Sequence, residues 1–366
     1  MIQDSELISE SMPNRAAMAI TVDQKIYFDT FTTNLFLAIN DGNNLIIDGI
    51  NRSAKKNEII ILTPRFGELS FLKRKYLYIL ISNVNLPVQI GKVVRGTVTN
   101  LFEENILPRV PTQSMMVLVG EDQIPLFKEK CKIGDQIIFT SELKASNIDF
   151  DTTKIAQAVG GGPWLVKNSE KYIDYEIEGF KRNEFVNRRH PRTAVGINKD
   201  GEFCLITVDG RSSISRGASL SELADILLKL NIENAINLDG GGSTSMVIKD
   251  VYVNAPSDGF PREIANAILI YAVDEAEADP SQLALKDNAN DAAITMPEIE
   301  LKEKSRIGLV LPNNIEKEQG VLWGTLEGKC FVNQKGELIS IGFFRGNAAA
   351  ITKLNKKYFF PFKTVR

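Results

Sequence analysis

Short runs of β-branched and aromatic residues, each ended by a turn, recur through the first 275 residues and constrain the fold more than any other feature. Runs of this length and composition are typical of β-strands, because such side chains pack well on a pleated surface. We therefore predict a sheet-rich first half. The predicted strands are residues 17–20, 25–28, 45–47, 58–62, 76–81, 93–98, 115–119 and 136–140.

One amphipathic helix is predicted after Ser219. Leucine and alanine recur at helical spacing over residues 220–230, and Ser219 or Ser221 is suited to cap the first turn. A helix among strands indicates an α+β fold, here a sheet-rich catalytic domain with few helices. Further strands are predicted at residues 234–238, 245–248 and 267–273.

The composition changes again near residue 274. Residues 274–290 are acidic, rich in alanine and asparagine, and contain Pro280, which is typical of a linker. Beyond them, short alternating runs separated by Gly and Asn turns predict a small all-β C-terminal module. We expect a domain over residues 1–275, an acidic linker over 276–293 and the β module over 294–366.

Charge and hydropathy exclude several classes of partner. With 43 basic and 46 acidic residues the net charge is −3, which gives no reason to expect a nucleic-acid partner. Every apolar run is far shorter than the roughly 20 residues that span a bilayer, so no transmembrane segment is expected. The first 13 residues are acidic and polar, unlike a signal peptide.

The three cysteines form no CxxC pair, and no cofactor is predicted, although a divalent cation is left open.

Two glycine-rich turns carry candidate ligand-binding residues. The first, at 160–162, is either a flexible turn or a backbone nest for an anion. The second, at 239–243, directly follows a strand-like run, where glycines admit a ligand close to the backbone. Neither has the spacing of a dinucleotide fingerprint or the lysine of a phosphate loop. The candidate substrate-binding residues of the two turns are Gly160, Gly161, Gly162, Asn237, Gly240, Gly241, Gly242, Ser243 and Thr244.

The single histidine, His190, stands close to Arg192. Neighbouring cations lower the pKa of a histidine, and arginines also supply the paired donors that a phosphate group accepts. Arg211 follows the Asp-Gly pair that begins at Asp209, and we interpret this pair as a tight turn between two strands. The turn would place Arg211 at a strand end, where we expect it to bind the same oxyanion as Arg192. Asp209 and Asp239 are the candidate catalytic carboxylates, which the sequence does not rank, and His190 is the candidate proton donor.

Several of these motifs, taken in order, resemble those of a known family. GGGP, HPRTAVG, DGR, SxGxSLxELA, NLDGGGSTSM and REIANAILI are similar to the motif series of the phosphodiester glycosidase family, whose domain is of the uncovering-enzyme type. The resemblance covers about residues 1–273, and NLDGGGS is its most specific part. Family domains usually carry a further segment before the equivalent of residue 6, so the chain is expected to begin inside the domain.

The resemblance implies hydrolysis of the glycosidic bond of a sugar-1-phosphodiester, of the N-acetylglucosamine-1-phosphate type. The departing phosphate is a good leaving group, so Arg192 and Arg211 stabilise its charge without a strong general acid. Asp239 or Asp209 then activates water or stabilises an oxocarbenium-like transition state. The resemblance also implies an extracellular or cell-envelope location, envelope or exopolysaccharide substrates, and cell-wall association through the C-terminal module.

Two alternatives stay open at this point. One is a carbohydrate-binding protein that kept the pocket and lost turnover. The other is a metal-dependent phosphodiesterase, in which Asp209, Asp239, Asn237 and His190 gather a divalent cation. The products separate the enzymes, because a glycosidase releases free sugar and a phosphodiesterase releases sugar phosphate.

Overall fold

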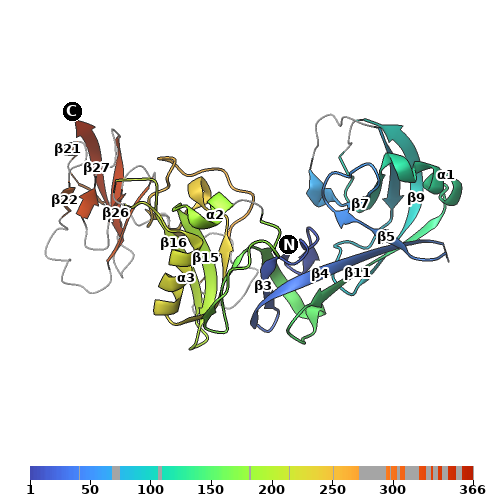
Figure 1. Cartoon of the computed structure of the whole chain (residues 1–366). Coiled ribbons are helices and arrows are strands. Elements are labelled where there is room, and N and C mark those ends of the chain that lie inside the picture. Colours follow the sequence, from blue (N-terminus) through green and yellow to red (C-terminus); the bar gives the residue numbers. More distant parts are fainter. Residues whose placement is uncertain are drawn as a thin grey trace. The chain divides into compact units, whose positions relative to one another are not determined.

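The computed structural model describes most of the chain as two compact units (Figure 1). Unit 1 comprises Met1–Trp164 and Tyr172–Lys181, and unit 2 comprises Leu165–Lys171 and Arg182–Arg366. No helix among the described residues is long and apolar enough to cross a membrane. The described residues are 1–40, 42–67, 75–105, 109–180, 183–213, 215–249, 251–271, 294–296, 298–302, 306–309, 321–326, 331–332, 337–339, 345–351 and 357–365.

Unit 1 is built on one large sheet. In its described part the strands run in the order β2-β1-β12-β3-β4-β11-β9-β8-β10-β7-β6, and β5 pairs with β4. All eight runs predicted as strands in the first half coincide with strands in the structure, apart from Lys25 and Glu58, which precede β4 and β7. Its strands are β1 (Ile2–Gln3), β2 (Glu6–Leu7), β3 (Ala16–Thr21), β4 (Ile26–Ile39), β5 (Leu45–Ile47), β6 (Gly49–Ile50), β7 (Ile59–Leu62), β8 (Tyr76–Ser82), β9 (Val93–Glu104), β10 (Ser114–Val119), β11 (Gln136–Ala145) and β12 (Ile155–Gly160), and its helices are η1 (Pro64–Phe66), η2 (Glu121–Gln123), α1 (Ile124–Lys130) and η3 (Thr152–Lys154).

The middle of this sheet is buried on both faces. Along β10 every side chain is buried, and alternate residues enter different apolar clusters: Met115 and Val117 join one, Met116 and Leu118 the other. This follows from the two-residue period of a strand, which points successive side chains to opposite faces. A continuous apolar run such as SMMVLV is therefore a strand with no solvent-facing side.

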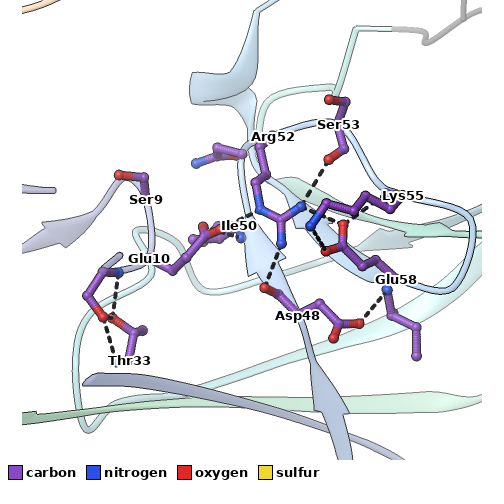
Figure 2. Close-up of polar contacts among 12 residues, drawn as sticks. Ser9, Glu10, Thr33, Asp48, Ile50, Arg52, Ser53, Lys55 and Glu58 are labelled. Atoms are coloured by element: carbon purple, nitrogen blue, oxygen red, sulfur yellow. Dashed lines mark hydrogen bonds and ion pairs between the residues drawn. The ribbon is translucent and has the colours of Figure 1, made fainter. Parts of the chain in front are cut away.

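An ion-pair network ties the N-terminal segment of unit 1 to the loop between β6 and β7 (Figure 2). The guanidinium of Arg52 lies between Glu10 and Glu58, donating from Nε to Glu10 and from Nη1 to Glu58 Oε2 at 2.7 Å. Arg52 Nη2 also donates to the carbonyl of Asp48 at 2.7 Å, and Glu10 Oε2 accepts from the backbone N–H of Ile50 at 2.9 Å. Every part of this network is paired, which is the arrangement that a partly buried charge requires.

Glu58 is the most enclosed carboxylate of the network. Burial alone would raise its pKa, but hydrogen bonds from Arg52 and from the backbone N–H and ammonium group of Lys55 outweigh burial and lower the pKa to about 2. The charged form of Glu58 is thus part of the folded structure at neutral pH.

Unit 2 contains a sheet of order β14-β13-β17-β15-β16, on which the predicted helix lies as α3 (Figure 1). Ser219 caps α3 in a capping box: its side chain accepts from the N–H of Glu222, and the Glu222 side chain accepts from the N–H of Ser219. The apolar stripe of α3 is buried, so the helix forms where its spacing predicted. The elements are β13 (Trp164–Lys167), β14 (Glu170–Lys171), α2 (Asn183–Asn187), β15 (Arg192–Asn198), β16 (Phe203–Val208), α3 (Leu220–Lys229), β17 (Ile232–Leu238) and η4 (Gly241–Ser243).

The C-terminal strands of unit 2 form two further sheets. The described parts of the larger sheet run in the order β18-β19-β23-β26-β27-β20, with β21 also on β27, and the smaller sheet is β22-β25-β24. The larger sheet includes β18 and β19, which precede residue 275, so strands from both sides of the predicted linker pair within it. The strands are β18 (Val247–Ile248), β19 (Val251–Tyr252), β20 (Ile294–Thr295), β21 (Ile299–Lys302), β22 (Arg306–Gly308), β23 (Leu322–Thr325), β24 (Phe331–Val332), β25 (Glu337–Ile339), β26 (Arg345–Ile351) and β27 (Lys357–Val365).

The predicted fold class is confirmed, because strands dominate both units and helices are few. The predicted linker at 276–293 lies outside the described residues, and the three domain boundaries remain predictions. The strand predicted at 267–273 is wrong over residues 267–271, which are not in a strand; residues 272 and 273 lie outside the description.

Candidate active site

The register of three strands in unit 2 brings the main candidate residues together. β15 runs antiparallel to both of its neighbours, and Arg192 pairs with Val208 at the end of β16 while Thr193 pairs with Leu238 at the end of β17. The start of β15 therefore meets the ends of β16 and β17. His190, just before β15, lies at the same edge as the residues that follow the other two strands.

The glycine turn after β17 is pressed against the segment before β15. Gly241 donates its N–H to the carbonyl of Pro191 at 2.9 Å, and a Cβ on Gly240 would lie 2.7 Å from the same oxygen. Gly241 has φ +64°, and a Cβ on Gly242 would collide with the ion-paired side chains of Asp258 and Arg262. Side chains are excluded at these glycines by close packing and, at Gly241, also by backbone conformation.

Arg192 is fully buried and is bound to backbone oxygens. Its Nε donates to Ala218 O at 2.8 Å, and its Nη2 donates to Phe185 O at 2.7 Å and to Arg188 O at 2.9 Å. Burial, with a contribution from Arg211, lowers the pKa of Arg192 to about 10. Its predicted contact with phosphate stays a prediction, while its contacts with three carbonyl groups are structural.

Arg211 is exposed and contacts the histidine. Its Nη2 lies 3.2 Å from His190 Nδ1, and its guanidinium lies over Gly241. Burial lowers the pKa of His190, and the charges of Arg192, Arg211 and Arg188 lower it further. Within the described part of the chain, neither Arg192 nor Arg211 forms an ion pair with a carboxylate.

The interpretation of Asp209 as part of a hairpin is wrong, because β16 is followed by a loop and α3 rather than by a strand. Gly210 is packed instead against Pro191, whose nitrogen would lie 2.8 Å from an added Cβ, and Arg211 takes a positive φ of 57°. Asp209 and Gly210 form no turn in the structure, and the chain bends at residues 211–213 instead, so the predicted tight turn is wrong as well.

The two candidate carboxylates are in different environments. Asp209 Oδ1 accepts from the N–H of Ala255 at 3.0 Å and from Asn254 Nδ2 at 3.2 Å. Burial raises the pKa of Asp209, although these two hydrogen bonds oppose the shift. Asp239 is exposed, and its Oδ1 accepts from the N–H of Gly240 at 2.9 Å. One aspartate is thus desolvated and the other faces water.

Sequence reasoning missed Asn254, which holds Asp209 in place. Asn254 is buried and uses both ends of its amide, because Nδ2 also donates to Thr244 O at 3.1 Å and Oδ1 accepts from the N–H of Met246 at 2.7 Å. The side chain therefore joins the turn after β17 to the loop after β16. Its sequence neighbours carry no motif, so no local signal indicated this role.

The other candidate residues at this sheet edge are mostly buried, and their side chains bind neighbouring groups of the protein. Asn237 is buried and donates from Nδ2 to Leu238 O at 2.7 Å. Thr244 is buried and its hydroxyl accepts from Thr193 Oγ1 at 3.3 Å, while Ser243 is half-buried in η4. Within the described residues no three histidine, cysteine or acidic side chains gather as ligands for a metal ion.

Gly160, Gly161 and Gly162 belong to unit 1, whereas the other candidates belong to unit 2. Gly162 has φ +115°, and an added Cβ would lie 2.7 Å from Glu178 Oε2. Glu178 is buried and accepts from the N–H of Trp164 at 2.7 Å and of Ala16 at 3.0 Å. Sequence reasoning missed this carboxylate, which links the backbone that follows the glycine turn to the start of β3. The binding role of the three glycines stays a prediction.

The fold and the site together define an α+β protein in which two carboxylates and a cation–histidine pair meet at one sheet edge, an arrangement suited to hydrolysis of an anionic substrate. A phosphodiester glycosidase family model matches residues 89–271, half of the chain. The chain belongs to the phosphodiester glycosidase family, as its motif series predicted.

Similarity to individual proteins is limited to part of their length. The N-acetylglucosamine-1-phosphodiester alpha-N-acetylglucosaminidases of Bos taurus and Homo sapiens are 33% and 31% identical to this chain over 152 residues, 37% of this chain and 29% of each relative. The match therefore spans less than a third of these relatives. A crystal structure of a hypothetical protein from Synechocystis has a TM-score of 0.56 and 22% identity, covering 68% of this chain and 43% of that one, which shows a shared fold.

Proposed function

We propose that this chain hydrolyses the glycosidic bond of a sugar-1-phosphodiester. The observation that carries the proposal is the sheet edge in unit 2, where the strand register places Arg211, His190, Asp239 and Asp209 at the same strand ends and where Arg211 forms no ion pair with a carboxylate of the described residues. A cation without a carboxylate partner is available to an anionic group of the substrate. Family membership supports the same reaction class.

The contrast between the two aspartates suggests a division of roles. Asp209, whose pKa is raised by burial, is suited to hold a proton and give it to the departing phosphate oxygen. Asp239, exposed after β17, is suited to take a proton from the attacking water. We favour Asp209 over His190 as the proton donor because burial and the surrounding arginines lower the pKa of His190 and so reduce its protonated form at neutral pH.

In this scheme the oxygen of water bonds to C1 of the sugar as the bond from C1 to the phosphate oxygen breaks. One proton of water goes to Asp239, and the proton of Asp209 goes to the leaving group. The products are a free sugar and a phosphomonoester. Arg211 stabilises the charge that develops on the phosphate during the step.

The substrate and its setting are finer proposals. The names of the two mammalian relatives specify N-acetylglucosamine-1-phosphodiesters, so we propose a sugar of this type for the present chain. The motif resemblance supports cell-envelope or exopolysaccharide glycans as substrates and an extracellular or envelope location. It also supports cell-wall association through the strands that follow residue 294.

The test is to incubate the full chain with an alkyl N-acetylglucosamine-1-phosphodiester, with and without chelator, and to identify the products by mass spectrometry. Asp209→Asn and Asp239→Asn are expected to lose turnover. Asp200→Asn is the matched control, because Asp200 is exposed at the opposite end of β15. Free N-acetylglucosamine supports the proposal, and sugar phosphate would replace it with phosphodiesterase chemistry. Sugar binding without turnover would support the carbohydrate-binding alternative.

A further inference from the structure

The contact between Arg211 and His190 determines which nitrogen of the ring carries a proton. A guanidinium has only N–H donors and no acceptor. Because Arg211 Nη2 lies 3.2 Å from His190 Nδ1, that nitrogen must offer its lone pair to make the hydrogen bond. A histidine with a free lone pair on Nδ1 is neutral and carries its proton on Nε2.

The charges that face His190 favour the same neutral state. Burial lowers the pKa of His190, Arg192, Arg211 and Arg188 lower it further, and Glu184 is the acidic group that opposes them. Glu184 is itself ion-paired with Arg188 at 2.8 Å, so its effect on the ring is partly neutralised. Three cations against one paired carboxylate leave the imidazolium form unfavourable.

The backbone that carries the His190 ring is held by hydrogen bonds. His190 donates its N–H to Ala218 O at 3.1 Å and accepts from Ala218 N–H at 3.0 Å. Arg192 Nε donates to the same Ala218 oxygen at 2.8 Å, and Gly241 N–H holds the carbonyl of Pro191 on the other side. Arg192 is therefore a residue that positions the backbone of His190. Within the described residues, Nε2 of His190 has no hydrogen-bond partner.

We infer that Arg211 and His190 form one anion-binding pair, in which Arg211 supplies the charge and neutral His190 donates from Nε2–H to a phosphate-ester oxygen. The inference rests on the proposed function for its ligand class, and it assigns His190 to binding rather than to proton transfer. A fixed neutral donor binds the oxyanion in both ground and transition states and leaves the acid role to another group.

The measurement is long-range ¹H–¹⁵N NMR on the full chain labelled with ¹⁵N-histidine at neutral pH. Since the chain has one histidine, both ring nitrogens are assigned without variants. We expect Nδ1 to be unprotonated and Nε2 to carry the proton, and we expect dimethyl phosphate to shift the Nε2 signal without changing the tautomer. An imidazolium, an Nδ1–H tautomer, or no response to dimethyl phosphate would overturn the inference.

Two variants locate the cause of the tautomer. Arg211→Met is expected to give a mixture of tautomers and to abolish the response to dimethyl phosphate. Arg216→Met, an exposed arginine in the same loop, is expected to leave both unchanged. The wild-type spectrum decides the tautomer even if Arg211→Met fails to fold. The expected spectrum without any hydrolysis would keep the inference and reject the proposed function, whereas hydrolysis by a protein with an imidazolium would do the reverse.

Discussion

Arg52 in unit 1 meets the carboxylates of Glu10 and Glu58, whereas Arg211 in unit 2 meets the ring of His190 and, within the described residues, no carboxylate. Both arginines follow a strand end, and both lie against a glycine whose added Cβ would contact the guanidinium. The two arginines differ in what neutralises the guanidinium charge. The carboxylates paired with Arg52 make it part of the folded framework, whereas the guanidinium of Arg211 is available to bind an anionic ligand.

The largest expected effect is that of Arg52→Met on stability. It leaves Glu10 and Glu58 without their shared partner in a partly buried site, and breaking such a pair costs about 3–5 kcal/mol. The free energy of unfolding by urea measures it. Arg65→Met is the control, because Arg65 is more exposed than Arg52 and pairs with a single carboxylate, that of Glu6, and we expect a loss below about 1 kcal/mol. Equal losses in the two variants would contradict the structural role of Arg52.

Arg192→Met is expected to come next, with a loss of about 3 kcal/mol and a loss of turnover. The variant removes a charged donor from three carbonyl oxygens in a buried site, of which Ala218 O keeps the N–H of His190, and hydrogen bonds to charged groups contribute about 1.5–3 kcal/mol each. Urea unfolding and hydrolysis rates on the same samples measure both effects. A stable variant that loses only substrate affinity would instead make Arg192 a direct phosphate ligand.

Arg211→Met, in contrast to Arg52→Met, is expected to lower activity strongly and stability only slightly. Removing an exposed arginine without a carboxylate partner changes the free energy of unfolding by less than about 1 kcal/mol, while kcat/KM falls about 100-fold through the lost stabilisation of the phosphate. Arg216→Met serves as the matched control and is expected to keep wild-type kinetics. If Arg211→Met unfolds like Arg52→Met, the contrast between the two arginines fails.

The smallest effect is a pH dependence of stability from Glu58. Its pKa is lowered from 4.5 to about 2 on folding, so its contribution is present above about pH 4.5 and is lost as the pH falls toward 2. Glu58→Gln is expected to be less stable at pH 7 and to show a shallower loss of stability between pH 4.5 and pH 2. Unfolding curves across this range test it, and parallel pH profiles for the two proteins would remove Glu58 as the source.

The sequence predicted the elements of the site better than their contacts. Periodicity indicated α3, and the strand before the glycine turn formed as β17, because both patterns are local consequences of burial. The hairpin at Asp209 was wrong because its geometry depends on Gly210 packing against Pro191, which is distant in sequence. Asn254 was missed for the same reason, since its partners lie in two loops that are distant from each other in sequence, Asp209 in one and Thr244 and Met246 in the other.

The pairing of β19 with β23 links the C-terminal strands to the candidate acid. Tyr252 of β19 lies opposite Thr325, and two residues further along the chain Asn254 donates to Asp209. A displacement of the C-terminal sheet is therefore passed through two residues of chain to the hydrogen bonds that Asp209 accepts from Asn254 and Ala255. A truncation before β23 removes that partner strand and leaves β19 as an unprotected edge, two residues before Asn254.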